Sequence, residues 1–100
     1  KIGLVTNTLR GQTLNALKRY KIEGYFDAIV TGSDVEKVKP YPDPVLKLCS
    51  KLDVMPEEAI LVGDTKNDYK AGKAAGCLVV GLNVDGDFVI SHLDELLQLV

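Results

Sequence analysis

Short apolar runs alternate along this chain with segments whose apolar residues recur at helical spacing. Four runs have the length and content of buried strands, at residues 1–6, 27–32, 59–63 and 77–82. Each is apolar at consecutive positions rather than at every second one, which is typical of strands covered on both faces. The pattern therefore predicts a parallel sheet buried between two layers of helices.

Helical patterns fill the intervals between these runs and follow the last one. They cover residues 13–20, 43–52, 67–76 and about 91–99. Asp43 followed by Pro44 is typical of a helix start, with the aspartate as N-cap, and Gly76 is typical of a helix end. Strands and helices alternate without a linker, a repeat or a low-complexity tract. We therefore expect residues 1–100 to form a single α/β domain with a three-layer, Rossmann-like fold.

Composition narrows the possible functions. Of the 100 residues, 46% are hydrophobic and 26% are charged, which is ordinary for a globular domain. The net charge is −2 and the lysines are scattered, so no nucleic-acid-binding surface is expected. The longest apolar runs fall far short of the roughly 20 residues that span a bilayer, and no basic-then-apolar leader opens the chain. The sequence predicts a cytoplasmic protein without a membrane segment.

Several single residues have ordinary structural interpretations. Cys49 and Cys77 fit none of the usual metal spacings and lie among apolar residues, so we expect buried, reduced thiols. His92 is the single histidine and is expected at the surface, while residues 83–88 are expected to form a turn. The chain starts at Lys1 and enters an apolar run at once, without an initiator methionine, so we expect it to be part of a longer protein.

Polar residues that follow three of the predicted strands carry the candidate chemistry. Thr6 and Asn7 come after the first strand, Lys39 follows the second at some distance, and Asp64 and Asp68 follow the third. The carboxyl ends of parallel strands share one edge of a sheet, so these groups are expected to converge there. Taken singly, each has another explanation: Thr6 and Asn7 could cap the next helix, and Lys39 could be a solvated loop lysine.

Asp64 and Asp68 form the most informative pair. They lie in the first turn of a predicted helix, whose positive end favours carboxylates by roughly 0.3–1 kcal/mol each when they are exposed. Two carboxylates one turn apart would nevertheless repel by roughly 4 kcal/mol at about 4 Å and an effective dielectric of about 20. A cation would remove this repulsion, and carboxylates without neighbouring His or Cys select Mg²⁺. With a hydroxyl at Thr6 and an ammonium at Lys39, the set indicates phosphoryl chemistry.

Three segments carry a family resemblance. GLVTNT at 3–8, KPYPDP at 39–44 and VGDTKNDYKAGKAAG at 62–76 resemble, in this order, the second, third and fourth motifs of the haloacid dehalogenase-like (HAD) hydrolases. The resemblance covers nearly the whole chain and is greatest to the branch of phosphoglycolate phosphatases. It implies a HAD-like form of the three-layer fold.

The resemblance also implies a role for each candidate residue. Thr6 and the backbone of Asn7 would bind phosphoryl oxygens, and Lys39 would neutralise the phosphoryl group and the nucleophile. Asp64 would bind Mg²⁺. Asp68 would support the metal, directly or through water, and orient Lys39.

One segment of the family pattern is absent. Family members share an Asp-x-Asp-x-Thr segment that supplies the aspartyl nucleophile and a general acid/base, and none occurs in this chain. By the resemblance it would precede Lys1, on a central strand between the strands that lead to Thr6 and Asp64, together with any helical cap domain. We therefore expect this chain to be the C-terminal portion of a hydrolase core, without the central strand and the cap.

The sequence leads to one main hypothesis and several alternatives. It predicts a Mg²⁺-dependent phosphatase that hydrolyses a small phosphorylated metabolite, such as phosphoglycolate or a sugar phosphate, through an aspartyl-phosphate intermediate. A phosphosugar mutase of the same family would carry similar core motifs. The alternative from another class is a non-catalytic HAD-like or receiver-like binding module. A haloacid dehalogenase is disfavoured because it needs no Mg²⁺. The residues specify neither the substrate nor the oligomeric state.

Overall fold

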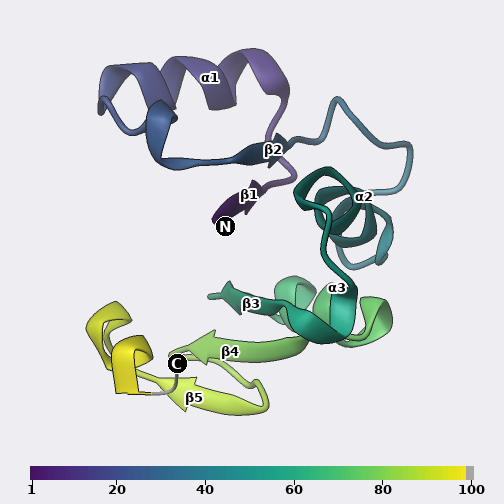
Figure 1. Cartoon of the computed structure of the whole chain (residues 1–100), viewed down its shortest axis with the longest axis vertical. Helices are drawn as coiled ribbons and strands as arrows, with labels where there is room; N and C mark the ends of the chain where they lie inside the picture. The colour runs from purple at the N-terminus through teal and green to yellow at the C-terminus, as the bar shows by residue number, and fades with distance from the viewer. Residues whose placement is uncertain (99–100) are drawn as a thin grey trace.

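The computed structural model describes residues 1–98, which form an α/β fold of parallel strands and helices (Figure 1). The strands and α-helices are, in chain order, β1 (Gly3–Val5), α1 (Arg10–Arg19), β2 (Ala28–Val30), α2 (Asp43–Leu52), β3 (Ile60–Gly63), α3 (Lys66–Ala75), β4 (Leu78–Leu82) and β5 (Phe88–Ile90). Three 3₁₀ helices lie between or after them, η1 (Glu23–Tyr25), η2 (Pro56–Glu58) and η3 (Leu93–Gln98). The predicted fold class is confirmed.

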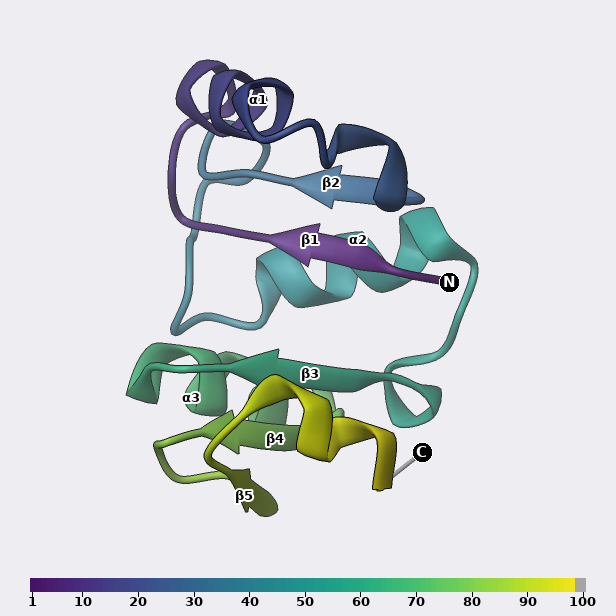
Figure 2. The same ribbon diagram turned by 90° about the vertical axis from the view of Figure 1, so that its left-hand side faces the viewer.

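All strands point in the same direction, but they form two groups. β1 pairs with β2, with Val5 opposite Val30, and β4 pairs with both β3 and β5, with Gly63 opposite Gly81. Within the described residues no backbone ladder joins β1 to β3, although these two strands are the inner neighbours in Figure 2. Each of them therefore presents a row of backbone N–H and C=O groups that no described strand pairs.

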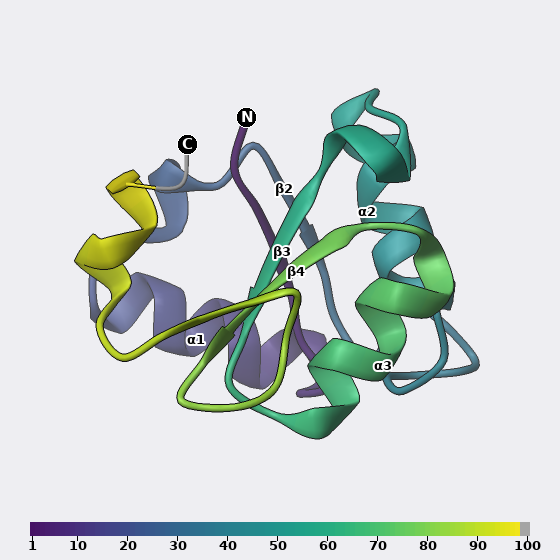
Figure 3. The same ribbon diagram turned by 90° about the horizontal axis from the view of Figure 1, so that it is seen from below.

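Helices cover both faces of the strands, which gives the predicted three layers. In Figure 3, α2 and α3 lie on one side of the strands, and α1 and η3 lie on the other. α2 contacts β1, β2 and α3, so it bridges the two strand groups. Its buried residues Val45 and Cys49 pack with Ala71 of α3 and with Cys77, which precedes β4. This apolar cluster holds the two groups together from one face.

The helix boundaries agree only partly with the local signals. α2 occupies the predicted residues 43–52, but the expected N-cap role of Asp43 is wrong. This residue already lies inside the helix, with Pro44 beside it in the first turn, and no side chain among residues 1–98 caps this end with a hydrogen bond. α1 begins earlier than predicted, at Arg10. α3 ends as predicted at Gly76, whose φ of 96° lies in the left-handed region that glycine adopts without strain.

The segment after β4 differs most from the prediction. The turn expected at 83–88 leads into a fifth strand, β5, and the 3₁₀ helix η3 replaces the α-helix expected at 91–99, of which Leu99 lies outside the described residues. Asp87 attaches this segment to the sheet. Its backbone N–H donates to the Val79 carbonyl and its carboxylate accepts the Val79 N–H, both at 2.8 Å. These bonds align the following residues with β4, to which β5 pairs as a parallel strand.

Three remaining expectations can be compared with the structure. Cys49 and Cys77 are buried free thiols, as predicted. His92 is exposed. No helix among residues 1–98 combines the length and the apolar character that crossing a bilayer requires.

Candidate active site

The predicted site residues gather at the edge to which the strands point, on the left in Figure 2. Thr6 follows β1, Asp64 and Asp68 follow β3, and Lys39 lies in the long connection between β2 and α2. A cavity of ≈ 330 Å³ is lined by these four residues and continues between apolar residues of β1 and β3. The convergence expected from the order of the strands is therefore observed.

Lys39 and Asp68 form the central contact of the site. Lys39 Nζ lies 2.5 Å from Asp68 Oδ1, and the two side chains are only 13% and 9% exposed. Burial alone would raise the pKa of Asp68, but the hydrogen bond and charge of Lys39, with the Thr65 hydroxyl and the Asp64 N–H, outweigh it and lower that pKa. The solvated-loop interpretation of Lys39 is therefore wrong.

The first turn of α3 fixes the carboxylate of Asp68. The Thr65 hydroxyl oxygen accepts the Asp68 N–H at 3.2 Å, while Asp68 Oδ2 accepts the N–H groups of Thr65 at 3.2 Å and Asp64 at 3.1 Å. This is a capping box in which aspartate takes the place of glutamate or glutamine. Gly63 permits it, because a Cβ at this position would lie 2.3 Å from the Asp68 Cβ. The family resemblance assigns Thr65 no role, but its spacing to Asp68 before a helix signals this cap.

Thr6 and Asn7 do not cap α1. The residue that precedes this helix is Leu9, and the Ser33 hydroxyl, rather than Thr6 or Asn7, accepts the Arg10 N–H at the helix start, at 3.0 Å. Thr6 Oγ1 instead accepts the Thr8 N–H at 3.1 Å, within the loop that leaves β1. A hydroxyl that accepts one hydrogen bond keeps its hydrogen for another partner. The helix-cap interpretation is wrong, and Thr6 can serve as a donor at the cavity.

Asn7 makes a contact that no local sequence pattern indicates. Its side-chain Oδ1 accepts the Lys39 N–H at 3.0 Å, and its Nδ2 donates to the Lys39 carbonyl oxygen at 3.1 Å. The two residues are 32 positions apart. The sequence assigns only the backbone of Asn7 to the site, so the role of its side chain comes from the structure.

Asp64 is the carboxylate best able to hold a metal ion. Its side chain is exposed and accepts no hydrogen bond from residues 1–98, whereas both oxygens of Asp68 have partners. Lys39 compensates the charge of Asp68, so repulsion between the carboxylates does not by itself require a metal. The described residues hold no cluster of three or more His, Cys, Asp or Glu side chains for a metal. Mg²⁺ needs no such cluster, because it takes one or two carboxylates and completes its shell with water and phosphate.

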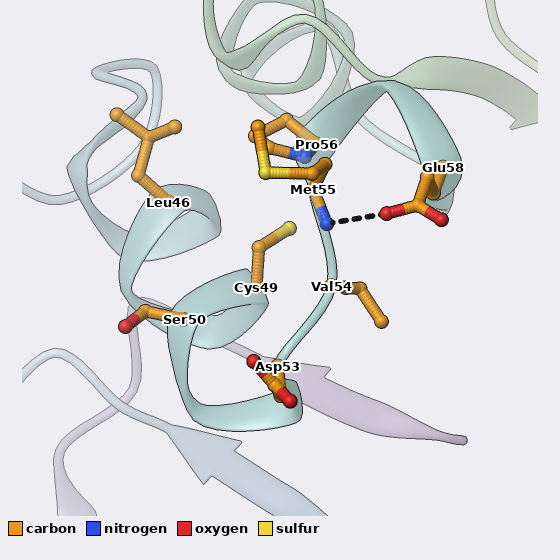
Figure 4. A pocket seen from close by; sticks show the side chains of 8 residues that line it. All are labelled: Leu46, Cys49, Ser50, Asp53, Val54, Met55, Pro56 and Glu58. Atoms are coloured by element: carbon orange, nitrogen blue, oxygen red, sulfur yellow. Dashed lines mark hydrogen bonds between the residues drawn. The ribbon is translucent and has the colours of Figure 1, made fainter.

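A larger cavity of ≈ 420 Å³ lies elsewhere, between the C-terminal turn of α2 and η2 (Figure 4). Cys49 and Met55 line it, and the Glu58 carboxylate there accepts the Met55 N–H at 3.0 Å. The eight described residues that line this cavity include no lysine, arginine or histidine. It offers no positive charge to a phosphate, so the smaller cavity is the better candidate site.

The sequence resembles those of known proteins. The sequence model of a family described as haloacid dehalogenase-like hydrolase matches residues 1–82. A phosphoglycolate phosphatase of Salmonella choleraesuis (strain SC-B67) is 44% identical over 81 residues, which cover 81% of this chain and 32% of that protein. The pyrophosphatase PpaX of Bacillus pumilus (strain SAFR-032) is 37% identical over an alignment of 111 residues, which covers 100% of this chain and 51% of that protein.

A solved structure extends the comparison to the fold. The crystal structure of a HAD phosphatase from Thermococcus onnurineus has a TM-score of 0.90 and 34% sequence identity, and the match covers 99% of this chain and 49% of that chain. The chain spans about a third to a half of the length of these relatives. It therefore corresponds to only part of each of them.

Proposed function

The chain belongs to the haloacid dehalogenase-like hydrolase family, and we propose that the complete protein is a Mg²⁺-dependent phosphatase of a small phosphate monoester. The observation that carries this proposal is the buried Lys39–Asp68 ion pair, which shares one cavity with Thr6 and the exposed Asp64. A phosphoryl group in reaction requires a hydrogen-bond donor, a positive charge and a metal-binding carboxylate. These residues would supply all three.

The relatives support the choice of substrate class. One of them is named for phosphoglycolate and another for pyrophosphate, and both compounds are small and phosphorylated. We propose a phosphoglycolate-like compound or a sugar phosphate as the substrate.

Each side chain would take one role in the reaction. The Thr6 hydroxyl and the backbone N–H of Asn7 would donate to phosphoryl oxygens. The Lys39 ammonium would oppose the charge of the phosphoryl group, and because Asp68 already holds it in place, it would need little reorganisation during the reaction. Asp68 would act mainly by orienting Lys39, since both of its oxygens are engaged.

Asp64 would hold the Mg²⁺ ion, with Asp68 supporting it directly or through water. When bound, the ion would polarise the phosphate and stabilise the negative charge that develops on its oxygens. The exposed, unengaged carboxylate of Asp64 supports this assignment.

The nucleophile would come from outside residues 1–100. We propose an aspartate on a parallel strand between β1 and β3, whose facing edges have no ladder partner among the described residues. Such a strand would end at the same edge as Thr6 and Asp64 and present its last residues to the cavity. The carboxylate oxygen would attack phosphorus, and the bond from phosphorus to the ester oxygen would break as a general acid of the same segment protonates that oxygen and releases the alcohol. Water would then hydrolyse the aspartyl phosphate to release inorganic phosphate.

The test of this function uses the complete gene product. Phosphoglycolate, several sugar phosphates and pyrophosphate are each incubated with the protein, in Mg²⁺ and in EDTA, and released phosphate is measured. We expect Mg²⁺-dependent release from at least one monoester. No release from any compound by a folded protein would overturn the proposal and favour the binding module, while interconversion of sugar phosphates without release would favour the mutase.

A further inference from the structure

We propose that the Asn7 side chain positions Lys39 by holding its backbone, so that the loop after β1 and the ammonium act as one unit. The inference rests on the proposed function, in which Lys39 faces the phosphoryl group. The two hydrogen bonds of 3.0 and 3.1 Å between the Asn7 amide and the backbone of Lys39 are here called the Asn7 clamp.

The amide of asparagine matches what the backbone of Lys39 presents. A residue in an irregular segment offers one N–H donor and one C=O acceptor, and an asparagine amide offers an acceptor and a donor side by side. Both bonds can form in only one orientation of the amide. Aspartate at position 7 would keep only the acceptor, and alanine would keep neither, which makes the contribution of each bond separable by substitution.

Lys39 is held by few other groups. It lies in the connection between β2 and α2, at residues 31–42, which contains no helix or strand and therefore no regular backbone ladder. The nearest backbone bond joins the Tyr41 N–H to the Val38 carbonyl at 3.0 Å. The ion pair with Asp68 fixes the tip of the Lys39 side chain, and the Asn7 clamp fixes its base. The two attachments come from the two different strand groups.

The backbone around Asn7 is itself held by the turn that contains Gly32. The Gly32 N–H donates to the Thr8 carbonyl at 2.9 Å, and a Cβ at Gly32 would lie 2.2 Å from the Asn7 carbonyl oxygen. The turn that contains Gly32 is in turn anchored by Asp34, which pairs with Arg10 of α1 at 2.5 Å. The loop after β1 thus has a rigid support, and the Asn7 clamp transmits its position to Lys39.

The first test compares Asn7→Ala with the wild type in the complete protein. Alanine keeps the backbone N–H that is proposed to bind phosphate, so we expect KM to change little. We expect kcat to fall by roughly 10- to 100-fold, because displacing a catalytic group by about 1 Å can cost about 10²-fold. The kcat of Asn7→Asp should lie between the values of the wild type and Asn7→Ala, or equal that of Asn7→Ala. Asn15→Ala, which removes an exposed asparagine of α1, is the matched control and should leave kcat unchanged.

A double-mutant cycle shows whether Asn7 acts through Lys39. If it does, Asn7→Ala should cost little further activity in a Lys39→Ala background, because the group it positions is gone. An equal fold-loss in both backgrounds would mean that the Asn7 side chain acts independently of Lys39, and the inference would be wrong. An unchanged kcat for Asn7→Ala alone would also overturn it.

A second measurement does not depend on the activity. Brief acetylation with acetic anhydride, followed by mass spectrometry, reports the accessibility of each lysine amine. We expect Lys39 to be labelled several-fold faster in Asn7→Ala than in the wild type, while the exposed Lys51 keeps its rate. Equal labelling rates of Lys39 in the wild type and in Asn7→Ala would contradict the inference even if the phosphatase assignment holds. If the wild type shows no phosphatase activity but Lys39 is labelled faster in Asn7→Ala than in the wild type, the proposed function fails and the Asn7 clamp is supported.

Discussion

Asp64 and Asp68 have the same side chain but different environments. Asp68 lies in the first turn of α3, where the helix N-terminus favours negative charge, whereas Asp64 precedes the N-cap Thr65, so the prediction that places both in the first turn holds only for Asp68. Asp68 is buried and bound by Lys39 and by two backbone N–H groups, so its oxygens organise the site. Asp64 is exposed and contributes only its N–H to that network. The charge that balances Asp68 comes from 29 positions away, beyond the reach of any local pattern.

This difference leads to a prediction for Asp64→Asn in the complete protein. Because its carboxylate has no described partner, the substitution should change the free energy of unfolding by no more than about 0.5 kcal/mol. Mg²⁺-dependent turnover should fall by roughly 10²-fold or more, since a preorganised charged group in the transition state is worth that much. Steady-state kinetics across a Mg²⁺ titration, with a thermal melt of each protein, provide the measurement.

The control for that prediction is Asp53→Asn. Asp53 is exposed, follows the C-terminal end of α2, and has a left-handed conformation that asparagine also adopts readily. It should retain wild-type turnover. Near-normal activity of Asp64→Asn at saturating Mg²⁺ would show that this carboxylate does not hold the metal.

At the scale of elements, the sequence predicts those that have a strong local signal. β1 to β4 and α2 follow from unbroken apolar runs and from a clear helical period. β5 is not predicted, because Phe88 directly follows the turn-forming residues 83–87. In the structure Phe88 and Val89 are exposed and only Ile90 is buried, so the pairing of β5 depends on tertiary hydrogen bonds. The site shows the same division. Its candidate residues can be predicted from strand ends and motifs, whereas the Asn7 clamp joins separate loops and has no local signal in the sequence.

The junction between β3 and α3 permits a prediction at this scale. In Gly63→Ala the added methyl group would lie 2.3 Å from the Asp68 Cβ and 2.6 Å from its Oδ2. The first turn of α3 would have to move away from β3, so we expect a loss of roughly 1–3 kcal/mol in stability, as for other overpacked sites. Turnover should also fall because Asp68 no longer aligns Lys39. Urea unfolding and kinetics of the complete protein check both effects.

Gly11→Ala is the matched control for this substitution. A Cβ at Gly11 meets nothing within 4 Å, and the residue lies in α1, so alanine should stabilise the helix by roughly 0.5–1 kcal/mol. If Gly63→Ala were as stable and as active as Gly11→Ala, the close packing of β3 against Asp68 would not matter for the site.

At the scale of the whole molecule, the candidate site spans the two strand groups. Thr6 and Asn7 belong to the side of β1 and β2, and Asp64 and Asp68 belong to the side of β3 to β5. Lys39 reaches from one to the other through the Asn7 clamp and the ion pair. Apart from this bridge, α2 provides the main packing between the groups among the described residues. The geometry of the site therefore depends on how firmly the two groups are held together.

The last prediction concerns residues 1–100 expressed alone. The facing edges of β1 and β3 would leave backbone groups and apolar side chains to the solvent, and a typical domain has only about 5–15 kcal/mol of stability to offset such exposure. We expect a broad, non-cooperative thermal transition and no phosphate release, because no proposed nucleophile is present. Calorimetry and the phosphate assay on this segment are the measurements. A sharp two-state melt would show that the two groups need no strand between them, and Mg²⁺-dependent phosphate release would show that the attacking group already lies within this chain.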